Sequence, residues 1–308
     1  MSVGASLHLG LDLGATNLKW VVVERDAAAW RPLEDGQVPT RGEDGPGPVV
    51  DRLIEVAAGA IAARSAIASI GIGVPGLYDP ARGTARFLPN LPGEWTGRPV
   101  AGPVAEATGR PTALINDARA FGLAELRMGA GRGATSMIGL TLGTGVGGVI
   151  AIDGRVHQGH DGTGGELGHQ TIDPDGPWCT CGNRGCVEAF ARADVIAAAC
   201  GTGTVEEAVD RARAGDAVAV GGLAEVGRHL GIGIANAVVV VNPDRVVIGG
   251  GVARAGDLLL EPIRAELRAR VRVTSLDDVE LVLAELGTLA GAIGAAVHGA
   301  EQAEDAGA

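Results

Sequence analysis

Three of the chain's four cysteines lie within eight residues, as Cys179, Cys181 and Cys186, and His169 precedes them. Thiolates and an imidazole are ligands that Zn²⁺ prefers, and four of them complete the tetrahedron of a structural site. A disulfide would use two of these thiols and leave one over, and free cysteines are also common as small buried hydrophobes. The spacing favours a Cys₃His zinc site over these alternatives.

Two carboxylates bracket the cysteine segment. Glu166 lies just before His169, and Glu188 follows Cys186. A rigid metal-centred loop can hold such groups at fixed geometry. We therefore expect the segment to bind hydroxyl groups of a ligand, and we expect loss of a thiolate to disturb that ligand more than a phosphate bound elsewhere. Cys200 lies in an Ala-rich helical run and is predicted to be a core residue.

Two turns rich in glycine and threonine each follow a predicted strand, at residues 14–17 and 143–148. Such turns offer backbone N–H groups and a hydroxyl to phosphate, and glycine allows close approach. Neither turn matches a P-loop or a dinucleotide fingerprint, and an ordinary hairpin turn explains either one alone. Asp12 directly precedes the first turn, where an acid can hold Mg²⁺ directly or through water.

Asp117 and Asn90 are further polar candidates. Asp117 follows a predicted strand, where open α/β sheets place ligand groups, but aspartate at this position is also a frequent helix N-cap. Position alone does not decide between these roles. Asn90 lies between two prolines, Pro89 and Pro92, where asparagine is commonly a turn former.

The composition limits the class of protein. A chain of 308 residues is long enough for two domains that share a cleft. It is 46% hydrophobic but only 3% aromatic, so its core must consist mainly of Ala, Val, Leu and Ile. The net charge of −12 argues against a nucleic-acid surface, which needs clustered positive charge. It does not argue against an anionic substrate, because local loops and magnesium can bind phosphate.

We expect a cytoplasmic protein with no membrane segment. The sequence shows no evident signal peptide, and its longest apolar candidate, residues 235–241, ends at Asn242-Pro243. Reduced thiols that bind zinc also fit a cytoplasmic setting.

The hydrophobic pattern alternates between strands and helices, which predicts an α/β fold. The two glycine turns each join paired strands, and their similarity suggests two related halves. The Gly/Pro-rich residues 42–48 are predicted to be a loop, and the tail after residue 300 is predicted to be disordered. Strands are predicted at 7–13, 18–24, 69–74, 112–115, 137–142, 149–152, 245–248 and 279–282, and helices at 51–69, 118–128, within 187–240, at 256–271 and at 287–300.

Three motifs together resemble the ROK family of sugar kinases and repressors. They are Asp12-Leu-Gly-Ala-Thr16, Leu142-Gly-Thr-Gly-Val-Gly-Gly148, and Glu166-Leu-Gly-His169 followed by Cys179-x-Cys181-Gly-x-x-Gly-Cys186-x-Glu188. The last motif is highly specific, whereas the phosphate turns are shared by the wider actin/hexokinase superfamily. The resemblance spans about residues 7–298. It implies two ribonuclease-H-like domains with nucleotide and sugar in the cleft, which we place at 1–116 plus 288–308 and at 117–287.

The resemblance also implies a role for each matching residue. Asp117 would be the general base on the sugar hydroxyl, and Asp12 would help to hold magnesium. Sugar hydroxyls would be bound by Asn90, Asn116, Asp117, Glu166, His169 and Glu188. The phosphates of ATP would be bound by Gly14, Thr16, Gly143, Thr144 and Gly145, with Gly250 and Gly251 near the nucleoside. Structural zinc would be bound by His169, Cys179, Cys181 and Cys186.

The chain departs from the family pattern in two places. Ala15 stands where the family usually has a second glycine, and Asn17 where a lysine is usual. Alanine tolerates most of that turn's dihedral angles, so we expect nucleotide binding to survive. The segment from Asn90 to Trp95 is longer than in typical glucokinases, and it borders the sugar in the family. This departure weakens the case for glucose in particular.

The function expected from these features is ATP-dependent phosphorylation of a hexose or a related polyol, with an aminosugar or a cyclitol as alternative acceptors. A sugar-responsive repressor is disfavoured, because such members carry a helix-turn-helix before the core and only six residues precede the first predicted strand. A sensor without catalysis is disfavoured by the presence of Asp117. The resemblance also implies a homo-oligomer.

Overall fold

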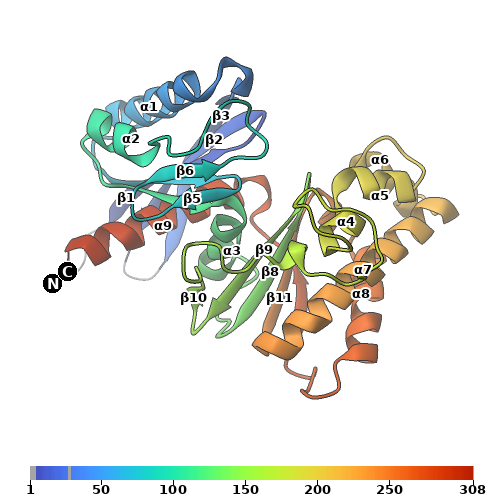
Figure 1. Cartoon of the computed structure of the whole chain (residues 1–308). Helices are drawn as coiled ribbons and strands as arrows, with labels where there is room; N and C mark the ends of the chain where they lie inside the picture. The colour runs from blue at the N-terminus through green and yellow to red at the C-terminus, as the bar shows by residue number, and fades with distance from the viewer. Residues whose placement is uncertain (1–4, 27–28, 308) are drawn as a thin grey trace. The chain divides into compact units, whose positions relative to one another are not determined.

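The computed structural model describes residues 5–26 and 29–307, which form two compact units (Figure 1). The first unit comprises Met1–Gly129, Gln158–Gly164 and Thr288–Ala308, and the second comprises Ala130–His157 and Gly165–Gly287. The sequence-based division differs because it assigns the helix after Asn116 to the second domain. In the structure that helix packs against the C-terminal helix and belongs to the first unit.

The first unit is built on a five-stranded sheet in the order β3-β2-β1-β4-β7. Strands β1, β2 and β3 are antiparallel, whereas β4 and β7 run parallel to β1. The strands are β1 (Ser6–Leu13), β2 (Asn17–Arg25), β3 (Trp30–Pro39), β4 (Ile67–Val74) and β7 (Thr112–Asn116), and the helices are α1 (Pro46–Ala63), α2 (Ala101–Thr108), α3 (Asp117–Met128) and α9 (Ala290–Gly307). A small hairpin, β5 (Leu77–Asp79) with β6 (Thr84–Phe87), completes the unit.

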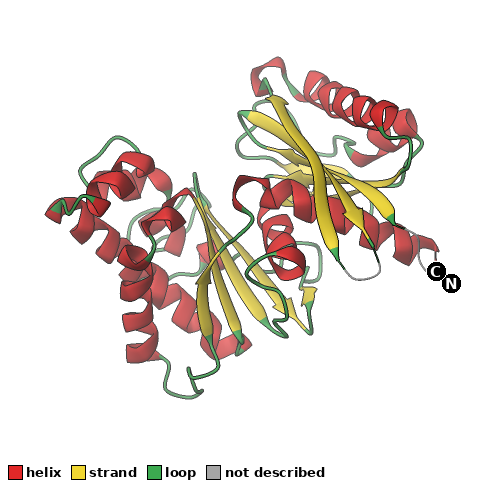
Figure 2. Cartoon of the chain, turned by 180° about the vertical axis from the view of Figure 1, so that it is seen from behind, coloured by secondary structure: helices red, strands yellow, loops and turns green. Residues whose placement is uncertain are grey.

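The second unit repeats this arrangement. Its sheet has the order β10-β9-β8-β11-β12, with β8 to β10 antiparallel and β11 and β12 parallel to β8. In each unit, helices lie next to the sheet (Figure 2). The strands are β8 (Met137–Leu142), β9 (Val146–Ile152), β10 (Arg155–Val156), β11 (Arg245–Gly250) and β12 (Glu280–Leu283), and the helices are α4 (Val187–Ala191), α5 (Ala193–Ala199), α6 (Val205–Arg213), α7 (Ala217–Val241) and α8 (Asp257–Arg270). The predicted α/β class and the two related halves are therefore confirmed.

Some elements differ from the sequence prediction. Strand β3 was not predicted, because its proline, glycine and charged residues give little apolar alternation on an exposed edge. The tail after residue 300 was predicted to be disordered, and this was wrong, because α9 continues to Gly307. Helix α1 begins at Pro46, inside the predicted loop, where proline suits the first helical turn.

Helix α7 is long and apolar enough, by length and composition, to cross a membrane. In the structure its buried residues, among them Leu223, Leu230 and Ile234, belong to the core of the second unit. It also packs closely along α8. Burial on several sides explains its apolar composition.

Helix α9 contacts the first sheet so closely that side chains are excluded. A Cβ atom on Gly71 of β4 would lie 1.7 Å from the carbonyl oxygen of Ala295, and one on Gly10 of β1 would lie 1.8 Å from that of Ala292. These glycines let the backbones of helix and sheet touch, which fixes α9 against β1, the strand that contains Asp12, and against the neighbouring strand β4.

We predict that Gly71→Ala destabilises the protein strongly, because the added methyl group must push the α9 backbone away. Overpacking of this kind costs about 1–3 kcal/mol or more. Gly59→Ala is the matched control, since Gly59 lies on the exposed side of α1 and a Cβ there meets no atom within 4 Å. That change should be neutral or stabilising. Urea unfolding of both variants checks the difference, and equal stabilities would contradict the packing described here.

Candidate functional site

Asp12 lies at the carboxyl edge of three parallel strands. In the sheet register Asp12 pairs with Gly73 of β4, which in turn pairs with Ile115 of β7. Neighbouring strands lie about 4.8 Å apart, so the backbones of Asp12 and Ile115 are separated by about 10 Å. The edge of the sheet therefore brings Asp12 near the start of α3, which carries Asp117.

The carboxylate of Asp12 occupies a tight, partly buried position. A Cβ atom on Gly291, at the start of α9, would lie 2.7 Å from Asp12 Oδ2. Burial raises the pKa of the Asp12 carboxyl above its ordinary value, and the Lys19 ammonium opposes that shift. A bound cation would offset the cost of burying this charge, so the surroundings of Asp12 fit the magnesium role predicted from the sequence.

Asn116 provides the N-cap of α3 and also orients Asp117. Its Oδ1 accepts hydrogen bonds from the backbone N–H groups of Ala118 and Arg119, at 3.1 and 3.2 Å. Its Nδ2 donates to the carbonyl oxygen of Gly76 at 3.1 Å and to Asp117 Oδ1 at 3.0 Å. The cap that sequence reasoning assigned as an alternative role of Asp117 therefore belongs to Asn116, while Asp117 is partly exposed in the first turn.

The first glycine turn is braced by Thr40, a residue that sequence reasoning missed. The hydroxyl of Thr40 donates to the carbonyl oxygen of Gly14 at 2.7 Å, and its backbone N–H donates to that of Thr16 at 2.8 Å. Thr40 is buried, whereas Ala15 and Thr16 are exposed. The turn is therefore fixed on its buried side by Thr40 and accessible to solvent at Ala15 and Thr16, which suits a phosphate-binding turn.

Asn90 and Arg119 belong to two other parts of the first unit. Asn90 is exposed in a turn after β6. Arg119 is fully buried, and its Nε donates to the carbonyl oxygen of Gly164 at 2.8 Å. This bond holds the segment that leads to Glu166 against the helix that begins with Asp117. The sequence carried no signal for it, because the two residues are far apart along the chain.

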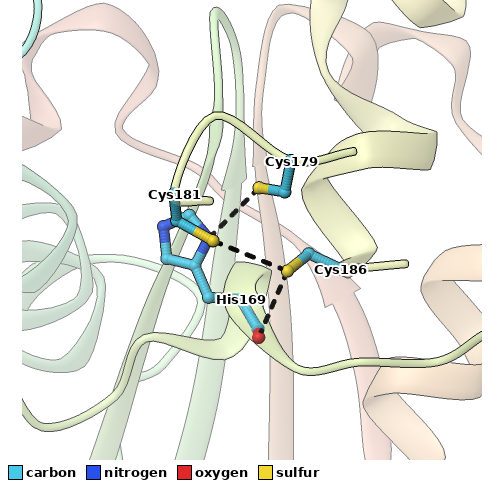
Figure 3. Close-up of side chains that lie close together, drawn as sticks. All are labelled: His169, Cys179, Cys181 and Cys186. Carbon is cyan, nitrogen blue, oxygen red and sulfur yellow. Dashed lines mark hydrogen bonds between the residues drawn. The ribbon is translucent and has the colours of Figure 1, made fainter. Parts of the chain in front are cut away.

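In the second unit the three cysteines and the histidine come together as predicted (Figure 3). Their four candidate ligand atoms lie within 4.8 Å of one another. Cys181 Sγ and Cys186 Sγ are 3.8 Å apart, and Cys179 Sγ is 3.6 Å from His169 Nδ1. A tetrahedral zinc with bonds of about 2.3 Å to sulfur and 2.0 Å to nitrogen requires separations of about 3.8 and 3.5 Å. The geometry therefore fits such an ion.

The charge balance of the cluster also fits a cation. Burial, together with hydrogen bonding among the neighbouring thiols, raises the pKa of Cys186 to about 12. The raised pKa favours a neutral thiol at Cys186 in the metal-free protein, and a metal ion among the three sulfurs would displace the thiol protons and balance the charge of the thiolates. Cys200 lies outside the cluster, is buried and donates to the carbonyl oxygen of Ala219, so its predicted core role is confirmed.

Glu188 lies in the first turn of α4, directly after the cluster, and is buried. Its Oε2 accepts the backbone N–H of Val146 at 2.9 Å. Its Oε1 accepts the hydroxyl of Thr180 at 3.0 Å and the thiol of Cys179 at 3.5 Å. Sequence reasoning missed Thr180, although its place between two predicted ligands was a signal.

The second glycine turn follows β8, as the first follows β1. Gly143 and Thr144 are exposed at its tip. Gly250, at the end of β11, has a φ of 90°, and a Cβ atom there would lie 2.0 Å from the carbonyl oxygen of Leu142. The glycine at position 250 therefore lets β11 approach the base of the turn, with Gly251 beside it. Glu166 is the N-cap of a short 3₁₀ helix, Leu167–His169, in the same unit, and His169 is its last residue.

We predict that Gly145→Ala destabilises the ligand-free protein, because a Cβ atom there would lie 2.4 Å from Glu188 Oε2 and would displace the carboxylate from Val146. Leaving a buried polar group unsatisfied costs about 1–3 kcal/mol. A Cβ atom on Gly143 meets nothing within 4 Å, so Gly143→Ala should change the stability by less than about 0.5 kcal/mol. Chemical denaturation without ligands distinguishes the two variants, and equal losses would show that Glu188 does not constrain position 145.

The repeated sheet and its paired glycine turns define the class of protein. A structure with this fold is the ROK hexokinase from Thermus thermophilus, with a TM-score of 0.82, 37% identity, and coverage of 97% of this chain and 99% of that one. Another is the ROK family glucokinase from Streptomyces griseus in complex with glucose and AMPPNP, with a TM-score of 0.80, 31% identity, and coverage of 96% and 100%. The fold is therefore that of the actin/hexokinase superfamily.

The sequence comparison narrows this class to one family. The ROK family model matches residues 8–301. The chain is 35% identical over 308 residues to the glucokinase of Thermotoga maritima, covering 94% of this chain and 95% of that protein. The chain belongs to the ROK family, as its motifs indicated.

Proposed function

We propose that this chain is an ATP-dependent sugar kinase that phosphorylates a hydroxyl of a hexose or a closely related polyol. One observation carries most weight: Asn116 orients Asp117 at the carboxyl edge of the sheet that also ends in Asp12. Glucokinase relatives over nearly the full length support the same activity. A base and a magnesium ligand on one edge are what phosphoryl transfer to an alcohol requires.

Three side chains of the first unit, Asp117, Asn116 and Asp12, have roles in this reaction. Asp117 accepts the proton of the attacking sugar hydroxyl, and its oxygen Oδ1 is aimed by the Asn116 amide. The amide of Asn116 already makes four hydrogen bonds, which favours a positioning role over direct sugar binding. Magnesium supplies charge neutralisation of the phosphates when bound, and Asp12 would help to hold it.

The glycine turns provide donors for the nucleotide phosphates. Thr16 of the first unit and Gly143 and Thr144 of the second are exposed, and Gly14 and Gly145 beside them are partly exposed. Backbone N–H groups and the threonine hydroxyls suit phosphate oxygens. The turn after β11, with Gly250 and Gly251, would lie near the nucleoside.

The acceptor would be bound by Asn90, Glu166, His169 and Glu188. His169 directs Nδ1 toward Cys179, so a metal on that atom leaves Nε2 for a sugar hydroxyl. Glucose is the leading acceptor, because the Streptomyces griseus relative was solved with glucose and AMPPNP. An ADP-release screen across hexoses, aminosugars and cyclitols with ATP and magnesium tests this proposal, and activity with none of them would overturn it.

The cysteine cluster would hold one structural zinc ion, since four protein ligands leave no open coordination position. The ion would fix the loop that carries His169 and lies between Glu166 and Glu188. We also propose that the chain forms a homo-oligomer, as the family resemblance implies.

We predict that Asp117→Asn lowers turnover by roughly 10²–10⁴-fold while the sugar affinity changes little, because the amide keeps the shape but cannot take the proton. Asp153→Asn is a matched control, since Asp153 is exposed and its φ of 52° suits asparagine. Steady-state kinetics of both variants provide the measurement. Near-wild-type turnover of Asp117→Asn would remove the general-base assignment.

We predict one zinc ion per chain in the purified protein. Cys181→Ser should lose most of this metal because it removes a ligand, whereas Cys200→Ser should retain it, since Cys200 lies outside the cluster. Elemental analysis and thiol titration measure both. Metal-free protein with three titratable thiols in the segment would refute the site.

A further inference from the structure

The glycine turn of the second unit is held at both ends by residues that follow Cys186. At its start, the carbonyl oxygen of Gly143 accepts the backbone N–H of Ala193 at 2.9 Å. At its end, the backbone N–H of Val146 donates to Glu188 Oε2 at 2.9 Å. Ala193 begins α5 and Glu188 lies in α4, whose N-cap is Cys186. A helix pair that begins at a metal ligand therefore fixes the turn that would bind phosphate.

A second connection runs through the side chain of Thr180. This residue lies between Cys179 and Cys181, and its hydroxyl donates to Glu188 Oε1 at 3.0 Å. The thiol of Cys179 approaches the same oxygen at 3.5 Å. The carboxylate of Glu188 therefore has one oxygen on the cysteine loop and the other on the glycine turn.

A third connection passes through the backbone beside His169. A Cβ atom on Gly168 would lie 1.9 Å from the carbonyl oxygen of Val146. The backbone next to His169 is therefore in direct contact with the last residue of the turn. Val146 is constrained by Glu188 at its N–H and by Gly168 at its carbonyl.

We infer that the metal cluster positions the nucleotide-binding turn as well as the acceptor loop, with Glu188 and Thr180 as the positioning residues that transmit the constraint. This inference rests on the proposed function, because it takes residues 143–145 as the phosphate site. It differs from the expectation from the sequence that loss of a thiolate would disturb the hydroxyl-bearing ligand more than a phosphate bound elsewhere. That expectation treated the turn and the cluster as separate, whereas the contacts join them in one unit.

The test uses Thr180, because changing it leaves all four metal ligands in place. Thr180→Val removes the hydroxyl at nearly constant shape, and Thr180→Ser keeps it. Thr274→Val is the matched control, since its hydroxyl also makes one side-chain hydrogen bond, to Asn242 Oδ1 at 2.7 Å, in a different loop of the unit. Magnesium–AMPPNP binding is measured by calorimetry without sugar, and hydrogen exchange of the Val146 amide is measured without any ligand.

We expect Thr180→Val to weaken AMPPNP binding by about 10-fold, the effect of losing one hydrogen bond to a carboxylate that holds the turn. It should also speed exchange at Val146 while retaining the metal. Thr180→Ser and Thr274→Val should resemble the parent protein, and chelation of the metal should reproduce the Thr180→Val effect in protein that stays folded. If chelation unfolds the protein, the comparison of Thr180→Val with Thr180→Ser alone tests the inference.

Unchanged AMPPNP affinity and unchanged Val146 exchange in folded Thr180→Val protein would overturn the inference. These readouts do not depend on turnover. A protein that phosphorylates no sugar, but in which Thr180→Val still weakens AMPPNP binding, would therefore overturn the proposed function and leave the coupling in place.

Discussion

The buried carboxylate of Glu188 is the contact on which the second unit's site depends. A buried acid is costly unless its oxygens are satisfied, and here the donors come from two different segments, the glycine turn and the cysteine loop. Neither segment has much regular structure of its own. Satisfying one charge therefore fixes the relative position of a predicted phosphate turn and a predicted metal cluster.

In the first unit, different side chains hold the glycine turn and the catalytic candidate in place. Its glycine turn follows the same strand position in a sheet of the same order, but it is braced by Thr40 instead of a glutamate. The amide of Asn116 then fixes Asp117 at the same edge. In both units buried polar side chains form hydrogen bonds that hold more exposed groups in place, which preorganises a site.

The fold class and the convergence of His169 with three cysteines could be predicted from the sequence, because both are encoded locally. Apolar alternation marks β1 and β8. The four side chains that could bind a metal lie within one short segment of the sequence. Strand β3 could not be predicted, since an exposed edge strand needs little apolar patterning. The continuation of α9 past residue 300 was also missed, because its polar end gave no core-facing pattern.

The contacts around the site were harder to predict than its principal residues. The bracing by Thr40, the bond from Arg119 to Gly164 and the bond from Thr180 to Glu188 each join residues whose pairing depends on the tertiary fold. A motif identifies the groups that carry chemistry, but it does not show which neighbours use their remaining hydrogen-bonding capacity. This is why Asn116 was assigned to the sugar, whereas its amide is engaged with α3, Gly76 and Asp117.

We propose above all that this chain transfers a phosphoryl group from ATP to a sugar hydroxyl. Phosphorus NMR of the protein with ATP, magnesium and glucose tests it most directly, because the spectrum distinguishes a sugar phosphate from free phosphate. We expect a new phosphomonoester signal that grows as ATP is converted to ADP, and no such signal without sugar. Release of inorganic phosphate alone, or binding of sugar without any change in ATP, would contradict the claim and favour a sugar sensor.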